Sequence, residues 1–381
     1  MVETESAVDL RLSDDQAFFQ ATTRRFLAER TPLSRVRDLI DDPRGFDLDA
    51  WRQGAELGWF SMLVPEADGG GSVSGSGVVD LMIIARELGS ALFPGPVLTT
   101  NVVAAALARG GSAEQVAAWL PDIVSGETIA SWAVAELDGR WDVRGADMMA
   151  RPSVDGLVLS GVKTAVEFGD AADLFLVSAR SDGGVLHALV PADSQGVSAV
   201  ALGHMDLARR FAEVQFDDVV VPSSCILGTP LNGESLLRSL LDLAIILQCA
   251  ETLGAMERTF AFTLEYSKDR KAFGRPIGSF QAIKHRFADM ALWLESSEAA
   301  AEAAADAVQA DIPGTDAPSI AKAYIADRAV DLVRECLQIH GGIGFTWEHD
   351  LHLFLRRVES NRAIFGDPEV QLDRLAEKVG L

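Results

Sequence analysis

The hydrophobic pattern of the chain changes twice, and this restricts its fold to a helical segment, a sheet and a second helical segment. Up to about Gly126 the apolar residues recur at helical spacing. Between about Thr128 and Gly228, short runs rich in Val and Leu are separated by Gly and Asp, as in DGLVLSG and ADLFLVSAR, and such runs are typical of strands. After Asn232 the helical spacing returns. The chain is therefore predicted to place a small β domain between two helical domains.

Local signals support each part of this division. Ser13 is followed by two aspartates, which predicts a helix N-terminus, and Pro32 interrupts the helical pattern that follows. In FAEVQF, residues 211–216, apolar and polar residues alternate, which predicts an antiparallel sheet with one solvated face. The segment that ends at His340 keeps one apolar stripe at i, i+3 and i+4 spacing, so we expect it to join a helical bundle.

Composition argues against several kinds of partner. The 381 residues are 48% apolar and 23% charged, which is ordinary for a globular protein with a sizeable core. Lys and Arg number 33 and Asp and Glu number 56, so the formal charge of −23 argues against duplex nucleic acid or an anionic membrane as the main partner. The residues MVETESAVDL lack the basic start and the apolar core of a secretory signal, so we expect a cytoplasmic protein.

The sequence carries no pattern of a metal site. Its three cysteines, Cys225, Cys249 and Cys336, are far apart, and no group of Cys and His residues has zinc-ligand spacing. We expect these cysteines to pack in the core.

The stretch DRKAFGRPIGSFQAIKH, residues 269–285, is the most specific chemical signal in the chain. Arg270 is a cation that can hold a phosphate, Phe273 offers an aromatic surface, and Gln281 has a two-sided amide for a polar ligand. From these residues alone, an interfacial cluster without a ligand stays open as the alternative.

A second motif, QIHGGIGFTWEHD at residues 338–350, sets a glycine pair behind a helical run. Glycine permits a positive φ and allows a ligand or another chain to approach the backbone closely. The plain alternative is a helix stop, where glycine is also common.

Together with GWFSMLVPEADGGG at residues 58–71 and AVAE at 133–136 followed by Asp142, these two motifs resemble the acyl-CoA dehydrogenase family over nearly the whole chain. The resemblance implies FAD as cofactor, an acyl-CoA thioester as substrate and an electron-transferring flavoprotein as electron acceptor. It also implies that a carboxylate removes an α-proton of the thioester while the flavin takes up a hydride.

The resemblance further implies a division into three domains. We expect an α+β protein with an N-terminal helical domain over residues 1–126, a middle antiparallel β domain over 127–229 and a C-terminal four-helix bundle over 230–381. In this family FAD extends between subunits, so that the last domain of one subunit meets the ADP half of its neighbour's cofactor.

By the same resemblance, five residues of this chain would contact FAD in a partner's site. Arg270, Phe273 and Gln281 would contact its diphosphate and adenosine. Gln338 and Gly342 would line the close approach of the backbone to the same cofactor.

The family's catalytic glutamate is missing. It commonly lies in a turn that here spans residues 364–368, and Gly366 stands at its position. Other members place it on the helix before RKAFG, where this chain has Ala244. Asp367 is the only carboxylate beside the expected position, which makes it a candidate base. Asp242 lies near the family's CoA-binding acid, with a solvated surface acid as the alternative.

The positions that would seat this chain's own flavin also depart from the family. Residues 135–136 (Ala-Glu) and 140–142 (Arg-Trp-Asp) stand where Thr-Glu and Gly-Ser-Asp are usual, and residues 165–167 (Ala-Val-Glu) replace Trp-Ile-Thr. The hydroxyls and the stacking indole are lost, and bulky and acidic side chains crowd the region.

Three hypotheses follow. The first, which we favour, is a base-deficient subunit that pairs with a catalytic homologue in an α2β2 heterotetramer, similar to the actinobacterial steroid-degrading members of the family. The second is a self-sufficient homo-oligomeric dehydrogenase with Asp367 as its base. The third is a binding or scaffolding protein without redox function, because a fold does not guarantee its chemistry.

Overall fold

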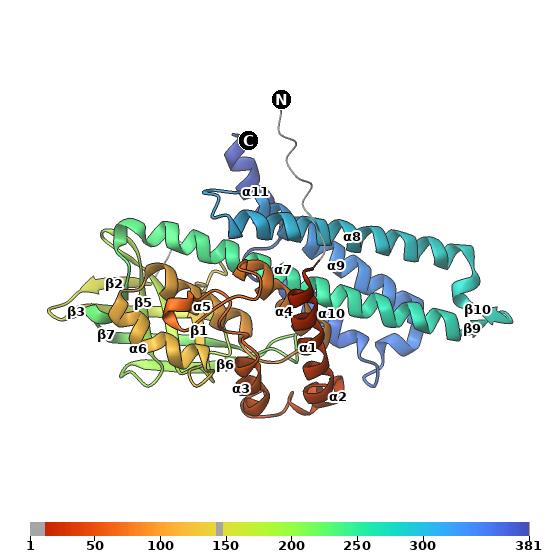
Figure 1. Ribbon diagram of the computed structural model, residues 1–381, viewed down its shortest axis with the longest axis horizontal. Helices are drawn as coiled ribbons and strands as arrows, with labels where there is room; N and C mark the ends of the chain where they lie inside the picture. The colour runs from red at the N-terminus through yellow and green to blue at the C-terminus, as the bar shows by residue number, and fades with distance from the viewer. Residues whose placement is uncertain (1–11, 142–147, 381) are drawn as a thin grey trace.

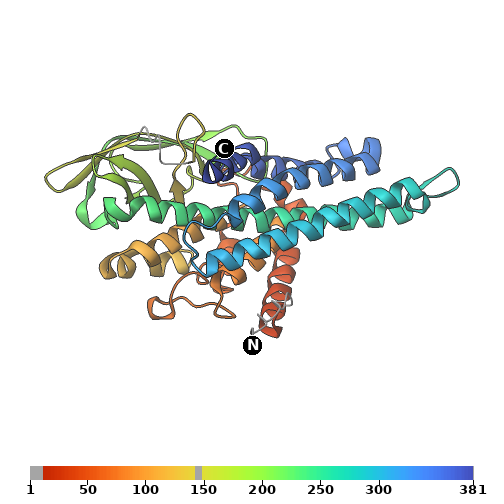
Figure 2. The same ribbon diagram turned by 90° about the horizontal axis from the view of Figure 1, so that it is seen from above.

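The computed structural model describes residues 12–141 and 148–380. Asp142 and the residues MVETESAVDL, on which parts of the sequence argument rest, lie outside these ranges. The molecule is elongated, with the sheet at one end and long helices running toward the other (Figures 1 and 2). The predicted order of helices, sheet and helices is confirmed.

The first N-terminal helix begins at a capping residue. Ser13 Oγ accepts a hydrogen bond from Gln16 N at 3.2 Å, and Gln16 Oε1 accepts one from Ser13 N at 3.0 Å, so both bonds of a capping box are present. The helix start predicted at Ser13 is confirmed, and the helix ends before Pro32. The elements of this part are α1 (Asp14–Arg30), α2 (Leu33–Asp38), α3 (Leu48–Glu56), η1 (Glu66–Asp68), α4 (Gly77–Ala91), α5 (Val97–Gly110) and α6 (Ala113–Val124).

The middle part forms one sheet, ordered β6-β7-β3-β2-β4-β5-β8 with β1 beside β4. Five of the pairings are antiparallel, as predicted. Both β1 and β2 run parallel to β4, however, so the sheet is mixed. Neither strand is joined to β4 by a hairpin, which would have imposed opposite directions. The strands are β1 (Ala130–Ala133), β2 (Met149–Pro152), β3 (Gly156–Glu167), β4 (Leu174–Ser181), β5 (Gly184–Pro191), β6 (Val197–Leu202), β7 (Phe211–Pro222) and β8 (Ile226–Leu227).

Strand β7 shows how the sheet builds its core. Ala212, Val214 and Phe216 are buried, whereas Gln215 is exposed, as the alternation in FAEVQF predicts. The buried side chains join a cluster with residues of β3, β4 and β5. One face of β7 therefore packs inward and the other meets solvent.

The C-terminal part is a helical bundle around α7. This helix is 40 residues long, and it is the one helix of the described ranges with the length and apolarity to cross a membrane. Its apolar window is 89% buried within the protein, which is typical of a central core helix. The elements are α7 (Pro230–Asp269), β9 (Lys271–Ala272), β10 (Arg275–Pro276), η3 (Ile277–Ser279), α8 (Gln281–Gln309), α9 (Ala317–His340), η4 (Gly341–Phe345), α10 (Leu351–Ala363) and α11 (Pro368–Val379).

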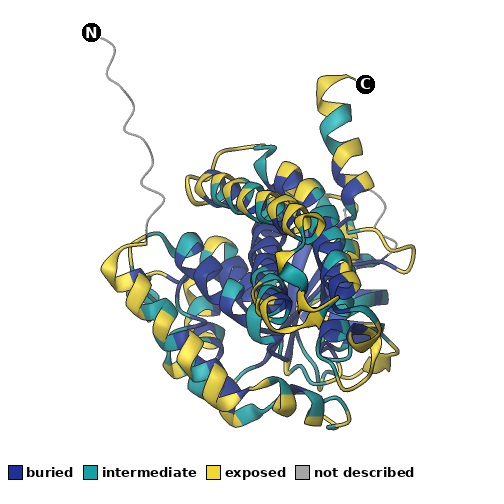
Figure 3. Cartoon of the chain, turned by 90° about the vertical axis from the view of Figure 1, so that its right-hand side faces the viewer, coloured by how far each residue is buried: buried dark blue, intermediate teal, exposed yellow. Residues whose placement is uncertain are grey.

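Helix α9 carries the predicted apolar stripe. Ile325, Leu332 and Cys336 are buried, while Tyr324 at the edge of the stripe is 36% exposed. One buried cluster contains side chains of the N-terminal helices, of β1 and of the bundle. This shared core is the dark interior in Figure 3, and it explains why the three parts pack as one body.

The cysteines are free and mostly internal. Cys249 and Cys336 are buried and Cys225 is half-buried, in agreement with the predicted core packing. Within residues 12–141 and 148–380, no group of three or more His, Cys, Asp or Glu side chains is placed to hold a metal ion.

Candidate functional site

The five residues predicted to contact a cofactor are all exposed, and we call them the cofactor edge. Arg270 is the C-cap residue of α7, Phe273 lies in the turn between β9 and β10, and Gln281 begins α8. Gln338 lies in the last turn of α9, and Gly342 lies in η4.

Ring contacts hold the two halves of the cofactor edge at the same end of the bundle. The ring of Tyr266 on α7 stacks on the ring of His340 on α9, with centroids 4.2 Å apart. Phe262, also on α7, contacts His340 edge-on at 6.0 Å. Tyr266 lies one helical turn before Arg270, and His340 lies in the same last turn of α9 as Gln338. The structure therefore brings together two motifs that are far apart in the sequence.

Packing inside this chain does not account for Phe273 and Gly342. Phe273 is 97% exposed and has a φ of 52°, a left-handed conformation that costs a non-glycine residue free energy. A Cβ on Gly342 would meet nothing within 4 Å, so the missing side chain leaves room for something outside the chain. An exposed ring, the guanidinium of Arg270 and an open stretch of backbone fit the adenosine and diphosphate of FAD.

Residues 364–368, which we call the base turn, connect α10 to α11. Gly366 has a φ of +90°, and a Cβ there would lie 2.7 Å from Nε2 of Gln371. Nε2 is held in place because it donates hydrogen bonds to the carbonyls of Phe365 at 2.9 Å and of Gly366 at 3.3 Å. A glutamate in this conformation would be both strained and crowded.

The other two candidate base positions, Asp367 and Ala244, both have a structural role in this chain. Asp367 is the N-cap residue of α11, and its Oδ1 accepts a hydrogen bond from Val370 N at 2.9 Å. A capping carboxylate satisfies a backbone amide that would otherwise lack a partner. Ala244 is 2% exposed on α7 and packs in the core.

Asp242, the candidate substrate contact, is half-buried on α7. Burial raises the pKa of its carboxyl to about 6, although Arg374, Lys378 and Arg238 lower it. Arg374 and Lys378 belong to α11, so cations of α11 act on the Asp242 carboxyl. Its contact with CoA stays a prediction.

Aromatic rings pack against the base turn from the sheet side. The ring of Phe365 lies 4.8 Å from that of Trp141 and 6.2 Å from that of Trp132, between centroids. The indole of Trp132 is fixed by a hydrogen bond, because its Nε1 donates to Ser178 Oγ at 3.2 Å. The chain thus covers this side of the base turn with its own side chains.

Glu167 stands where the resemblance predicts a threonine against the flavin, and here it is bound within the chain. Its Oε1 lies 3.0 Å from Nε of Arg209. Burial raises the pKa of Glu167 to about 7 even beside this cation. Along the same seat, Glu136 forms a buried ion pair with the ammonium of Lys163. Charges of the chain itself therefore occupy the positions expected around its own flavin.

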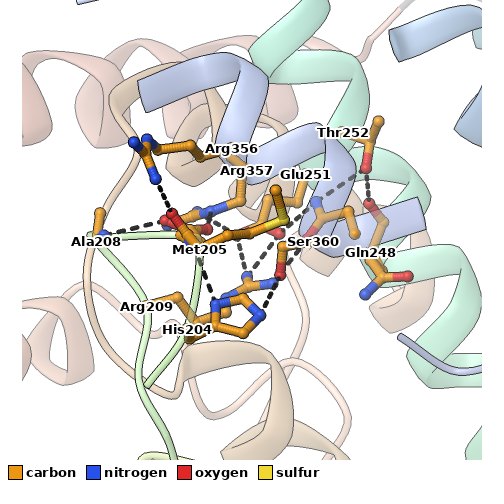
Figure 4. Close-up of polar contacts among 12 residues, drawn as sticks. His204, Met205, Ala208, Arg209, Gln248, Glu251, Thr252, Arg356, Arg357 and Ser360 are labelled. Atoms are coloured by element: carbon orange, nitrogen blue, oxygen red, sulfur yellow. Dashed lines mark hydrogen bonds and ion pairs between the residues drawn. The ribbon is translucent and has the colours of Figure 1, made fainter. Parts of the chain in front are cut away.

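Glu167 belongs to a buried group of charges that the sequence did not predict, and Figure 4 shows its centre. Arg209 donates to both carboxylate oxygens of Glu251, at 2.6 and 2.7 Å, and Arg357 donates to Glu251 at 2.9 Å. The two arginines lower the pKa of Glu251 although burial alone would raise it. We call this group the ion cluster, and its members are Glu167, Asp206, Arg209, Glu251, Arg357 and Asn361.

The ion cluster joins the sheet to the bundle. Its members come from β3, from the segment before β7, and from α7 and α10. Arg209 and Asn361, which are 152 positions apart, form one hydrogen bond of 2.7 Å. Two buried donors beside these contacts, Nη2 of Arg357 and Nε2 of Gln248, have no hydrogen-bond partner among the residues that the structure describes. No short sequence motif carries such a group, because its partners meet only after folding.

The cofactor edge and the base turn are separate parts of the molecule. Helix α10, with 13 residues, lies between η4 and the base turn, and a helix of that length spans about 20 Å. The ring contact of Tyr266 with His340 places the two motifs at one end of the bundle, and the candidate base Asp367 lies away from that end.

Comparisons with known proteins agree with this architecture. Models of the N-terminal, middle and C-terminal domains of acyl-CoA dehydrogenases match residues 13–127, 131–219 and 232–380. Acyl-CoA dehydrogenase IpdE2 of Mycobacterium tuberculosis is 32% identical over 96% of this chain and 98% of its own length.

Two solved structures are also similar to the chain. The ChsE4–ChsE5 complex of Mycobacterium tuberculosis has a TM-score of 0.88 and 28% identity, over 97% of this chain and 98% of the solved one. A variant of the Tcur3481–Tcur3483 steroid ACAD has a TM-score of 0.87 and 28% identity, over 96% of this chain and 97% of the solved one. The chain belongs to the acyl-CoA dehydrogenase family, whose members are FAD-dependent oxidoreductases.

Proposed function

We propose that the chain is a flavin-contacting, base-deficient subunit that works with a catalytic homologue to oxidise an acyl-CoA to the trans-2-enoyl-CoA. The base turn carries this proposal. A Cβ on Gly366 would lie 2.7 Å from Nε2 of Gln371, and the carboxylate of Asp367 caps α11. Removal of the α-proton needs a base in hydrogen-bond reach of it, so the partner must supply that base.

The placement of the cofactor edge supports a site shared between two chains. These residues are exposed, whereas Glu167 at this chain's own flavin seat is bound in the ion cluster. Arg270 would hold the diphosphate as a charged donor, and Phe273 would offer its face to the adenine. The flavin, when bound, supplies the acceptor for the hydride. Its ring would lie in the partner.

The relatives support a heteromeric assembly. One similar structure is described as the ChsE4–ChsE5 complex, and the other is named as the pair Tcur3481–Tcur3483. We propose an α2β2 heterotetramer of this chain and its catalytic homologue. Because the second structure is described as a steroid ACAD, a steroid-derived acyl-CoA is the substrate class we favour. An electron-transferring flavoprotein as acceptor and a cytoplasmic location complete the proposal.

Purification of the chain with and without the candidate partner tests the assembly. The chain alone should be FAD-poor or poorly soluble, because half of each cofactor site and an apolar helix face need another subunit. Coexpression should give a soluble yellow complex, and flavin absorbance with subunit stoichiometry should give one FAD per unlike pair. A yellow homotetramer with one FAD per chain, obtained without a partner, would overturn the proposal.

A further inference from the structure

Three of the 6 histidines of the chain, His340, His349 and His352, lie in one segment around η4. This histidine segment, residues 340–352, carries Gly342 of the cofactor edge and connects α9 to α10. The rings of His340 and His349 contact each other, with centroids 4.8 Å apart. We propose that these histidines make the segment acid-sensitive: they hold it in place while neutral and release it when protonated.

His340 lies among uncharged groups. Its Nδ1 donates a hydrogen bond to the Cys336 carbonyl at 3.0 Å, in the tautomer that this contact requires. Its ring stacks on Tyr266 at 4.2 Å and meets Phe262 at 6.0 Å. A proton on Nε2 would make His340 a buried cation beside His349.

His349 holds the first turn of α10. Its Nδ1 accepts a hydrogen bond from Leu351 N at 3.2 Å, so a neutral ring keeps its proton on Nε2. Protonation of Nδ1 would remove this acceptor and set two N–H groups against each other. The new cation would also lie near Arg37 of α2, whose Nη2 donates to the His349 carbonyl at 3.2 Å.

His352 and Arg37 both lie against Trp347. The imidazole stacks on the indole at 5.1 Å, and the guanidinium carbon lies 5.5 Å from the indole centroid. Nε2 of His352 is 3.2 Å from the Trp347 carbonyl and 3.4 Å from Nη2 of Arg37. Once both ring nitrogens carry protons, the contact between His352 and Arg37 joins two cations, which repel each other.

Among the described residues, Asp350 is the carboxylate that raises the pKa of His349 and His352. Asp350 is already paired with Nε of Arg37 at 2.9 Å, Glu348 is exposed, and Arg356 on α10 adds positive charge near His352.

Burial lowers the pKa of all three histidines in the folded state. A group whose folded pKa lies below its unfolded value of about 6.5 contributes its stabilisation fully above about pH 6.5. This stabilisation is lost as the pH falls from there through the folded pKa. The histidine segment should therefore be closed at neutral pH and open in mild acid.

The opening of the segment and its effect on the cofactor can be measured separately. Opening is a property of this chain and needs no flavin. If the cofactor edge binds FAD as proposed above, opening would also loosen the flavin, and this consequence rests on the proposed function. Flavin content of the complex at the same pH values therefore tests the cofactor edge rather than the histidine segment.

Hydrogen exchange tests the opening in the flavin-free full chain, alone or in its complex. Exchange of residues 341–351, corrected for the intrinsic rate at each pH, should show about tenfold more opening at about pH 5.5 than at about pH 7.5. His349→Asn should reduce this ratio, because asparagine can still accept from Leu351 N–H but takes up no proton. Replacement of His340, His349 and His352 together by asparagine should bring it to within about threefold.

His285→Asn on α8 is the matched control, since His285 is exposed and lies outside the segment. This variant should keep the wild-type response to acid. Equal corrected exchange at both pH values in the wild type would overturn the inference. So would a triple variant that still opens about tenfold in acid.

Discussion

At the scale of single residues, the base turn shows how two neighbouring positions are committed to the start of α11. Gly366 has a φ of +90°, and its missing side chain makes room for the amide of Gln371. Asp367 offers its carboxylate to Val370 N. A local requirement of the backbone explains both residues, and neither requirement involves a substrate.

Asp367→Asn should leave turnover of the partner-containing complex within a few fold of wild type, because asparagine caps a helix about as well as aspartate. Asp367→Ala should lower the free energy of unfolding by about 1 kcal/mol through loss of the cap. Steady-state turnover and urea unfolding measure the two effects. If Asp367→Asn instead lost about 100-fold in turnover with unchanged FAD content and assembly, Asp367 would be the base. The self-sufficient hypothesis would then replace our proposal.

Gly366→Ala should cost more stability than Gly69→Ala. Both glycines have a positive φ, +90° and +86°, but a Cβ on Gly69 would meet nothing within 4 Å. Gly69→Ala, the control, should therefore lower the free energy of unfolding by about 1 kcal/mol through the backbone alone. Gly366→Ala should lower it by about 1 to 3 kcal/mol more, through the contact with Gln371. Urea unfolding of both variants measures the difference. Equal costs would show that the turn can relax and admit a side chain.

At the scale of elements, the ion cluster connects β3, α7 and α10 across the boundary between the sheet and the bundle. Glu251 sits at its centre, because it accepts from Arg209, Arg357 and Asn361. Removal of one partner from a buried ion pair leaves an uncompensated charge, which costs more than the pair contributes. The cluster should therefore set how firmly the two parts are held together.

Glu251→Gln should lower the free energy of unfolding by about 3 to 5 kcal/mol, because both arginines would lose one of their two buried counter-charges. Glu234→Gln is a suitable control, since Glu234 pairs with Arg238 on the exposed surface of the same helix. The control should cost less than about 1 kcal/mol. Urea unfolding measures both changes in the free energy of unfolding. If both are similarly small, the ion cluster does not hold the sheet and the bundle together.

Glu167 should give the protein a pH dependence of defined sign. Its folded pKa of about 7 is raised above the ordinary 4.5, chiefly by burial. The stabilisation it contributes is therefore complete below 4.5 and is lost as the pH rises towards 7. Relative to wild type, the free energy of unfolding of Glu167→Gln should rise by on the order of 3 kcal/mol as the pH rises across this window. Unfolding free energies at several pH values measure the gain, and a constant difference would mean that the folded pKa is not raised.

At the scale of the whole molecule, the cofactor edge faces outward at one end of the bundle while the base turn lies at the far end of α10. Other large apolar side chains around η4, Phe345 and Trp347, are 69% and 58% exposed. Exposed aromatic residues beside an open backbone are typical of a surface that another molecule covers. The molecule therefore fits a role in which it completes a site on its neighbour.

Arg270→Ala should release FAD from the complex even though this chain lacks a base. A hydrogen bond between a phosphate and a charged donor contributes about 1.5 to 3 kcal/mol, which corresponds to about 10- to 100-fold weaker binding. Flavin absorbance after dialysis measures the loss. Arg258→Ala, an exposed arginine on the same helix, should keep its flavin. If the Arg270→Ala complex also keeps it, Arg270 does not contact the diphosphate.

The sequence by itself determined what depends on neighbours along the chain. Helical and strand spacing predicted the three parts, Ser13 predicted the start of α1, and the alternation in FAEVQF predicted which side chains of β7 are buried. The residues of the cofactor edge were named from a family resemblance of two continuous motifs, and their contact with FAD stays a prediction. Hydrophobic period and capping act over a few residues, so one chain is enough to recognise them.

Only the tertiary structure decided what depends on residues that meet across the fold. The strand directions around β4, the partners of Glu167 and Glu251, and the meeting of Arg37 with the histidine segment join parts of the chain that lie far apart. The free energy of a buried charge is set by the three-dimensional arrangement of its neighbours, and a linear pattern does not contain that arrangement. The same holds for Asp367, whose role as a cap follows from the backbone path of the base turn.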